Sequence, residues 1–175
     1  MSIKTKTPLE KYLELPEGYP AELIEGEIVV APSPGVRHQE IAIDISSKMR
    51  FFADERKAGK VLYEIDVHFD EENVLRPDVI FVKNENRAII GEKWIEGAPD
   101  IVVEILSPSS ATRDLLVKKD LYESFGVKEY WIIDPENEEV FVYENKGGKF
   151  SLICRGKRCS SKILDGFDWG FSENR

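Results

Sequence analysis

Apolar side chains recur along this chain with two different periods, and the period separates the expected helices from the expected strands. Between about residues 37 and 57 they return every three or four positions, at Ile41, Ile45, Met49 and Phe52. Side chains with this spacing lie on one face of a helix. The pattern therefore predicts a long amphipathic helix in the first third of the chain.

The segments expected to be strands either alternate apolar and polar residues or are apolar throughout. The stretch "KVLYEIDVHF" alternates, whereas "PDIVVEIL" is almost wholly apolar, as a central strand covered on both faces would be. A second helix is expected over about 111–125, followed by Gly126, a residue type at which helices commonly end. The expected strands are 60–69, 74–83, 99–106 and 128–134.

Hairpins are expected near both ends of this series. The stretch "AELIEGEIVVAPSP" predicts one hairpin, with Gly26 at its turn and Pro32 and Pro34 ending its second arm. The stretch "EVFVYENKGGKFSLI" predicts the other, with "NKGG" at its turn. Residues 1–20 form a lead-in, and residues 84–97 are expected to form a loop.

The order of these elements predicts the fold class. One helix separates "PDIVVEIL" from "KEYWIID", so these strands should form a parallel pair with a right-handed crossover. The strands before them can be antiparallel neighbours. We therefore expect an α/β fold, with a mixed central β-sheet flanked by helices and hairpins at either end. Residues 1–175 are expected to form a single domain, with Tyr130 and Trp131 in its core.

The distribution of apolar residues predicts a cytoplasmic protein with no membrane-spanning segment. No apolar run approaches the roughly 20 residues that span a bilayer, and the first residues lack the apolar centre of a signal peptide. Cys154 and Cys159 are separated by four residues. They could close a small loop or supply half of a metal site, but in a reducing cytoplasm two free thiols are the favoured interpretation.

The chain is acidic, with a net charge of −9. Proteins that coat nucleic acid through bulk electrostatics usually carry a basic face, so the charge argues against that mode of binding. It leaves open a local basic groove, or phosphate binding assisted by a divalent cation.

Two acidic residues occupy positions where the strands should bury apolar side chains. Asp78 stands at the head of the apolar run in "RPDVIFV", and Glu104 lies inside "DIVVEIL". An ionised carboxylate without a partner is costly to bury. If pairing places the two acids level on one face, a divalent ion such as Mg²⁺ or Mn²⁺ between them would offset their repulsion. A salt bridge from Glu104 to Lys118 would also satisfy Glu104.

The helix after the Glu104 strand supplies the candidate lysine. Lys118 could reach back over the strand end, and Lys119 is the alternative. A lysine beside a metal would orient the attacking water or stabilise negative charge on a phosphate. Ser107, Ser109 and Ser110, which precede the helix, are expected to form its turn and N-cap, since no His and Asp pattern supports serine hydrolysis.

Several ordered motifs carry a resemblance to a known family. The stretches "ELIEGEIV", "RPDVIFV", "DIVVEILSPSS" and "KKDLYESFGVKEYWIIDP" together resemble the Uma-two family of restriction-endonuclease-like proteins. That family belongs to the PD-(D/E)XK nuclease superfamily. The similarity covers about residues 21–143, and implies a restriction endonuclease-like core and DNA as a partner.

The resemblance assigns roles to five residues. Asp78 and Glu104 resemble the two metal-binding acids, and Glu22 is a further candidate ligand. The usual lysine two residues after the second acid is absent, because that position is Leu106. In this family the lysine role is shifted to the following helix, which fits Lys118. His38 resembles an additional polar position near the site.

These observations lead to competing functional hypotheses. The first is a Mg²⁺- or Mn²⁺-dependent endonuclease that hydrolyses DNA phosphodiester bonds. The second is a catalytically inactive module that keeps the nuclease fold and binds a protein or a nucleic acid. A third is a hydrolase of a small phosphate compound. A homodimer, formed through apolar strands such as the one carrying Phe141 and Tyr143, would suit cleavage of both strands of a duplex.

Overall fold

A six-stranded mixed β-sheet forms the centre of the molecule in the computed structural model, which describes residues 5–107 and 112–172. The strand order is β11-β10-β9-β8-β6-β3. β8 and β9 are parallel, and the other neighbouring pairs are antiparallel, which confirms the predicted mixed sheet. The strands are β3 (Gly59–Tyr63), β6 (Val79–Lys83), β8 (Ile101–Ile105), β9 (Glu129–Asp134), β10 (Glu139–Lys146) and β11 (Lys149–Gly156).

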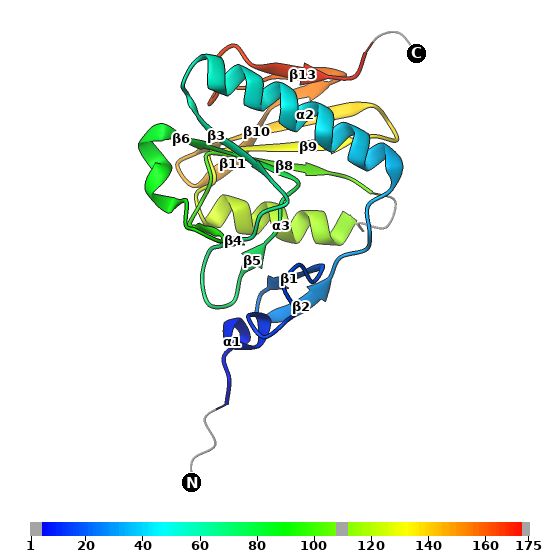
Figure 1. Cartoon of the computed structure of the whole chain (residues 1–175). Coiled ribbons are helices and arrows are strands. Elements are labelled where there is room, and N and C mark those ends of the chain that lie inside the picture. The colour runs from blue at the N-terminus through cyan, green and yellow to red at the C-terminus, as the bar shows by residue number, and fades with distance from the viewer. Residues whose placement is uncertain (1–4, 108–111, 173–175) are drawn as a thin grey trace.

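Helices cover both faces of this large sheet (Figure 1). α2 (Val36–Glu55) lies on one face with the strand pair β12 (Arg158–Ser160) and β13 (Asp168–Gly170). α3 (Thr112–Ser124) lies on the other face and makes the crossover between β8 and β9. Because strand side chains alternate, odd-numbered residues of β8 pack toward α2 and Val102 packs toward α3.

The core residues follow the predicted pattern. The predicted helical face is buried at Ile41, Ile45 and Met49, while Tyr130 and Trp131 are completely buried in β9. The C-terminal tail packs against the body, because Phe167 and Trp169 belong to the core under α2. Among the described helices, none is both long enough and apolar enough to cross a bilayer.

A second, smaller sheet corrects two of the strand predictions. Its order is β2-β1-β5-β4-β7. The strands expected over 60–69 and 74–83 are each divided, so that one part joins the large sheet and the other joins the small one. Glu64 ends β3 with a positive φ of 48°, and Pro77, which has no N–H to donate, separates β5 from β6. The strands are β1 (Ala21–Ile24), β2 (Glu27–Val30), β4 (Val67–His68), β5 (Val74–Leu75) and β7 (Ile95–Glu96).

The β1–β2 pair is the predicted N-terminal hairpin. Glu25 and Gly26 form its turn with φ of 50° and 80°. The lead-in before it contains a short helix, α1 (Pro8–Tyr12), and the Tyr12 hydroxyl donates to the Ala21 carbonyl. The segment expected to be a loop over 84–97 is more ordered than predicted, since it contains the 3₁₀ helix η1 (Asn84–Ile89) and β7.

The prediction of two free thiols is wrong. Cys154 and Cys159 form a disulfide, with their Cα atoms 5.9 Å apart. Cys154 is near the end of β11 and Cys159 is on β12, so the turn between the two strands brings the sulfur atoms together. The spacing of the two cysteines is compatible with a disulfide-closed loop, but the assumption of a reducing cytoplasm favoured free thiols.

Candidate active site

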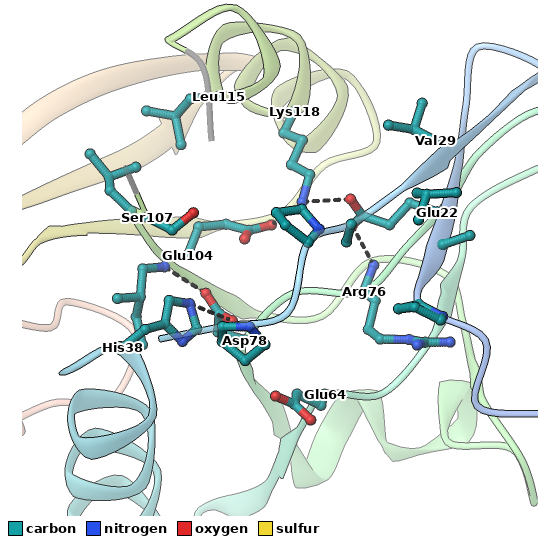
Figure 2. A pocket seen from close by; sticks show the side chains of 18 of the residues that line it. Glu22, Val29, His38, Glu64, Arg76, Asp78, Glu104, Ser107, Leu115 and Lys118 are labelled. Atoms are coloured by element: carbon teal, nitrogen blue, oxygen red, sulfur yellow. Dashed lines mark hydrogen bonds and ion pairs between the residues drawn. The ribbon is translucent and has the colours of Figure 1, made fainter. Parts of the chain in front are cut away.

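The five predicted site residues meet at one pocket of about 340 Å³ (Figure 2). The strand register explains why the two central acids lie together. Val79 of β6 is opposite Val103 of β8, so continuing the ladder by one position sets Asp78 opposite Glu104. Glu22 comes from β1, His38 from the first turn of α2 and Lys118 from α3. Side chains from β1, α2, β8, α3 and the position directly before β6 therefore converge on this pocket.

Asp78 is fixed by one backbone donor and one side chain. The Ile105 N–H donates to Asp78 Oδ2 at 2.6 Å, and His38 Nε2 lies 3.2 Å from Asp78 Oδ1. Burial lowers the pKa of His38, but its hydrogen bond to Asp78 and the charge of that carboxylate outweigh burial, so the pKa is raised overall. The imidazole is thereby favoured as a cation that holds Asp78 in place.

Glu104 lies inside β8 with only 8% of its surface exposed. Its Oε1 accepts hydrogen bonds from Tyr122 at 2.7 Å and from Lys118 Nζ at 3.2 Å. Burial raises the pKa of Glu104 to about 7; Lys118 opposes this shift, and the charges of Asp78 and Glu22 add to it. Near neutral pH this carboxyl group can therefore exchange a proton.

Lys118 bridges two carboxylates. Its Nζ lies 2.8 Å from Glu22 Oε2 and 3.2 Å from Glu104 Oε1. Burial lowers the pKa of Lys118, but the two acids outweigh it and hold the pKa above its usual value, so the side chain stays protonated. The other oxygen of Glu22, Oε1, accepts from the Arg76 N–H at 2.8 Å. In this arrangement both oxygens of Glu22 are engaged within the protein.

The structure separates the two candidate lysines. Lys118 enters the pocket, whereas Lys119 Nζ lies 4.7 Å from the centre of the Tyr143 ring. The Glu104–Lys118 salt bridge considered from sequence is also present. A metal role and a salt bridge are compatible, because a lysine beside a carboxylate can hold it in position for a cation.

The donor chemistry of Asp78 and Glu104 fits a hard divalent cation. Mg²⁺ prefers oxygen ligands and is commonly held by one or two carboxylates, with water and substrate phosphate completing its coordination. Across the described residues, no group of three or more His, Cys, Asp or Glu side chains is placed to hold a metal ion. The two facing acids therefore suit a cation that shares its coordination with a substrate rather than one enclosed by protein ligands.

Sequence reasoning missed two contributors to the site. Tyr122 donates to Glu104 and is completely buried. Its position four residues after Lys118, on the same helix face, could have revealed it. Arg76 lines the pocket, and its Nε donates to Asp66 at 2.6 Å; no sequence spacing indicates that pair. Ser107 also lines the pocket.

The other predicted serines, Ser109 and Ser110, lie outside the described residues. Their predicted place in the turn and N-cap of α3 therefore stays a prediction.

Comparison with known proteins places the chain in a family. The family model Uma2, described as "Putative restriction endonuclease", matches residues 9–159. The chain belongs to this family, as its motifs indicated, and the match extends beyond residues 21–143 at both ends. No curated protein matches the chain.

Two solved structures give further comparisons. A "putative nuclease belonging to DUF820" from Anabaena variabilis superposes with a TM-score of 0.72 at 25% identity, over 85% of this chain and 84% of that one. This similarity confirms the nuclease-like fold. A DrdV–DNA complex gives a TM-score of 0.44 at 14% identity, over 70% of this chain and 10% of that one, and this likeness is too slight to support an argument.

Proposed function

We propose that this chain is a Mg²⁺- or Mn²⁺-dependent nuclease that hydrolyses phosphodiester bonds in DNA. The main support is one observation: Asp78 and Glu104 stand opposite each other on neighbouring strands, and the Lys118 ammonium touches Glu104. Membership of a family described as restriction endonucleases points to the same chemistry.

Each residue has a separate task in this proposal. Asp78 and Glu104 would hold the cation, which would supply Lewis-acid charge to the phosphate when bound. His38 holds Asp78 in its orientation through the 3.2 Å contact. Lys118 keeps a positive charge beside Glu104, where it can orient the attacking water or stabilise negative charge on the phosphate. Glu22 positions the Lys118 ammonium.

Plasmid nicking tests the proposal. Native protein, Asp78→Asn and Glu104→Gln are compared in Mg²⁺ and in Mn²⁺, with Glu139→Gln as a control that removes an ion-paired carboxylate on β10 outside the pocket. Both site variants should lose at least about a hundredfold in nicking rate, and the control should nick like the native protein. Equal nicking by all four proteins would show that the acids are not the catalytic site.

A non-catalytic binding module is the second candidate, favoured by two observations. Leu106 occupies the position of the usual strand lysine. The ammonium of Lys118 is already paired with two acids, Glu22 and Glu104, so each of these carboxylates has a partner without a metal. Calorimetric titration with Mn²⁺ distinguishes the candidates. The nuclease should bind Mn²⁺, and Asp78→Asn should abolish this binding. A folded non-catalytic module should bind no Mn²⁺.

A further inference from the structure

One wall of the pocket is apolar and comes from the N-terminal hairpin. β2 is the edge strand of the small sheet, and Val29 and Val30 are exposed by 37% and 57%. Figure 2 shows Val29 and Leu115 on either side of Lys118. Apolar surface held open beside charged catalytic groups indicates a ligand with an apolar face. The apolar side chains on this wall include Pro20, Val29, Val30, Pro32 and Pro34.

The acids lie deep in the same pocket. The side chains of Asp78 and Glu104 are exposed by 15% and 10%, and that of Lys118 by 14%. A phosphate that reaches them must therefore enter the pocket. A volume of about 340 Å³ is at the small end of pockets that hold small molecules, which span roughly 300–1,000 Å³. Duplex DNA is a stiff, wide rod, and entry would require local unpairing.

The charges around the pocket are also unsuited to gripping a duplex. Among its described lining residues, the Lys and Arg side chains are Arg76 and Lys118, and both are already paired with acids. Glu64 lines the pocket together with the acids already described. A protein that holds a duplex by its backbone neutralises many phosphates with basic side chains. Binding here would therefore draw on a cation held by the acids and on contact with a base, rather than on many basic contacts to phosphates.

We propose that the pocket takes an unpaired nucleotide, as found in a single strand, a flap or an overhang. The base would pack against Val29, Val30 and Pro32, and its phosphate would reach Asp78 and Glu104. Unpaired bases are commonly held between apolar or aromatic side chains, and each such contact contributes substantially to binding. This inference rests on the proposed nuclease activity and specifies its substrate class.

The test compares four substrates with one labelled sequence: single-stranded DNA, a blunt duplex, the duplex with an unpaired tail, and single-stranded RNA. Binding is measured by fluorescence anisotropy, and cleavage is measured separately in the presence of Mn²⁺. Val30→Asp is compared with Leu152→Asp, since Leu152 is 49% exposed on the edge strand β11 outside the pocket. Native protein should bind and cut the single strand and the tail at least about tenfold better than the blunt duplex. The RNA arm shows which sugar is accepted.

The variants then test the wall itself. Val30→Asp should weaken single-strand binding and raise KM by about five- to tenfold, with little change in kcat, and Leu152→Asp should behave like native protein. Equal use of blunt duplex and single strand, or no effect of Val30→Asp, would overturn the inference. If native protein cuts nothing but still binds single strands through Val30, the nuclease proposal fails and the ligand assignment stands. If it binds none of the substrates, both fail.

Discussion

At the scale of single residues, the surroundings of Glu104 matter most for the candidate site, because they set the protonation state of this carboxyl group. It is buried in a strand, touches an ammonium and a phenol, and faces another acid across the ladder. Burial raises its pKa to about 7, with Lys118 opposing that shift. Its charge, and with it any metal site, therefore changes within the ordinary range of pH.

The first prediction concerns stability in metal-free solution. The pKa of Glu104 is raised from 4.5 to about 7 in the folded protein. Between these pH values the Glu104 carboxyl group is therefore protonated in the native state but ionised in the unfolded chain. Its stabilising contribution is therefore lost as pH rises from about 4.5 to about 7. The free energy of unfolding of native protein, relative to Glu104→Gln, should fall by at most about 1.4 kcal/mol per pH unit. Urea titrations with EDTA between pH 5 and 8 measure this difference, and a constant difference would contradict it.

The second prediction concerns Tyr122, whose hydroxyl donates to Glu104 and lowers the pKa of that carboxyl group. Tyr122→Phe should move the rising limb of the pH–rate profile for nicking to higher pH. Tyr130→Phe is the matched control, because the buried Tyr130 hydroxyl has no hydrogen-bond partner among the described residues. Identical profiles for the two variants would show that the phenol does not act on Glu104.

Sequence reasoning identified these residues unevenly, for physical reasons. Asp78 and Glu104 could be found because acids within apolar strands contradict the local pattern, and the family motifs supported them. For Tyr122 the only signal was its spacing from Lys118, because a tyrosine in an amphipathic helix is otherwise an ordinary core residue. The contact between Asp78 and His38 joins residues 40 positions apart and depends on how α2 crosses the sheet.

At the scale of elements, the alternation of strands and helices gave the large sheet its predicted parallel pair, β8 and β9. The predictions failed where one extended segment serves two sheets. Both long strands are cut at the junction between the sheets, near Glu64 and Pro77. Alternation of residue types cannot reveal such a cut, because each half still alternates.

Helix α3 supplies the third prediction, since neighbouring residues on a helix point in different directions. Lys118→Ala should reduce nicking by at least about tenfold, because it removes the ammonium between Glu22 and Glu104. Lys119→Ala should leave nicking near the native rate, because Lys119 lies over the Tyr143 ring. Single-turnover rates in Mn²⁺ measure both, and the reverse result would reassign the site lysine.

At the scale of the whole molecule, the net charge of −9 has to be reconciled with a nucleic-acid substrate. In the function proposed above, the acids of the site would bind a cation and its apolar wall would bind a base. The molecule then needs few phosphate contacts. The predicted homodimer stays a prediction, which light scattering in solution would decide.

The fourth prediction follows from this small number of phosphate contacts. For a single strand, affinity falls with salt in proportion to the number of phosphates neutralised. Raising salt from about 50 to 200 mM should therefore weaken single-strand binding by less than about tenfold. Anisotropy titrations at several salt concentrations measure the slope. A loss of a thousandfold would indicate a broad basic contact surface instead.

The anchoring of Asp78 has a consequence for how this protein can diverge. One of its oxygens is held by the main-chain N–H of Ile105, a donor that every amino acid except proline provides. Homologues can therefore exchange the side chain at position 105 over evolutionary time without releasing the acid. Proline should be excluded there because it has no N–H, and the burial of Ile105 favours an apolar side chain, so lineages can retain the shape of this corner of the pocket long after their other surfaces have drifted apart.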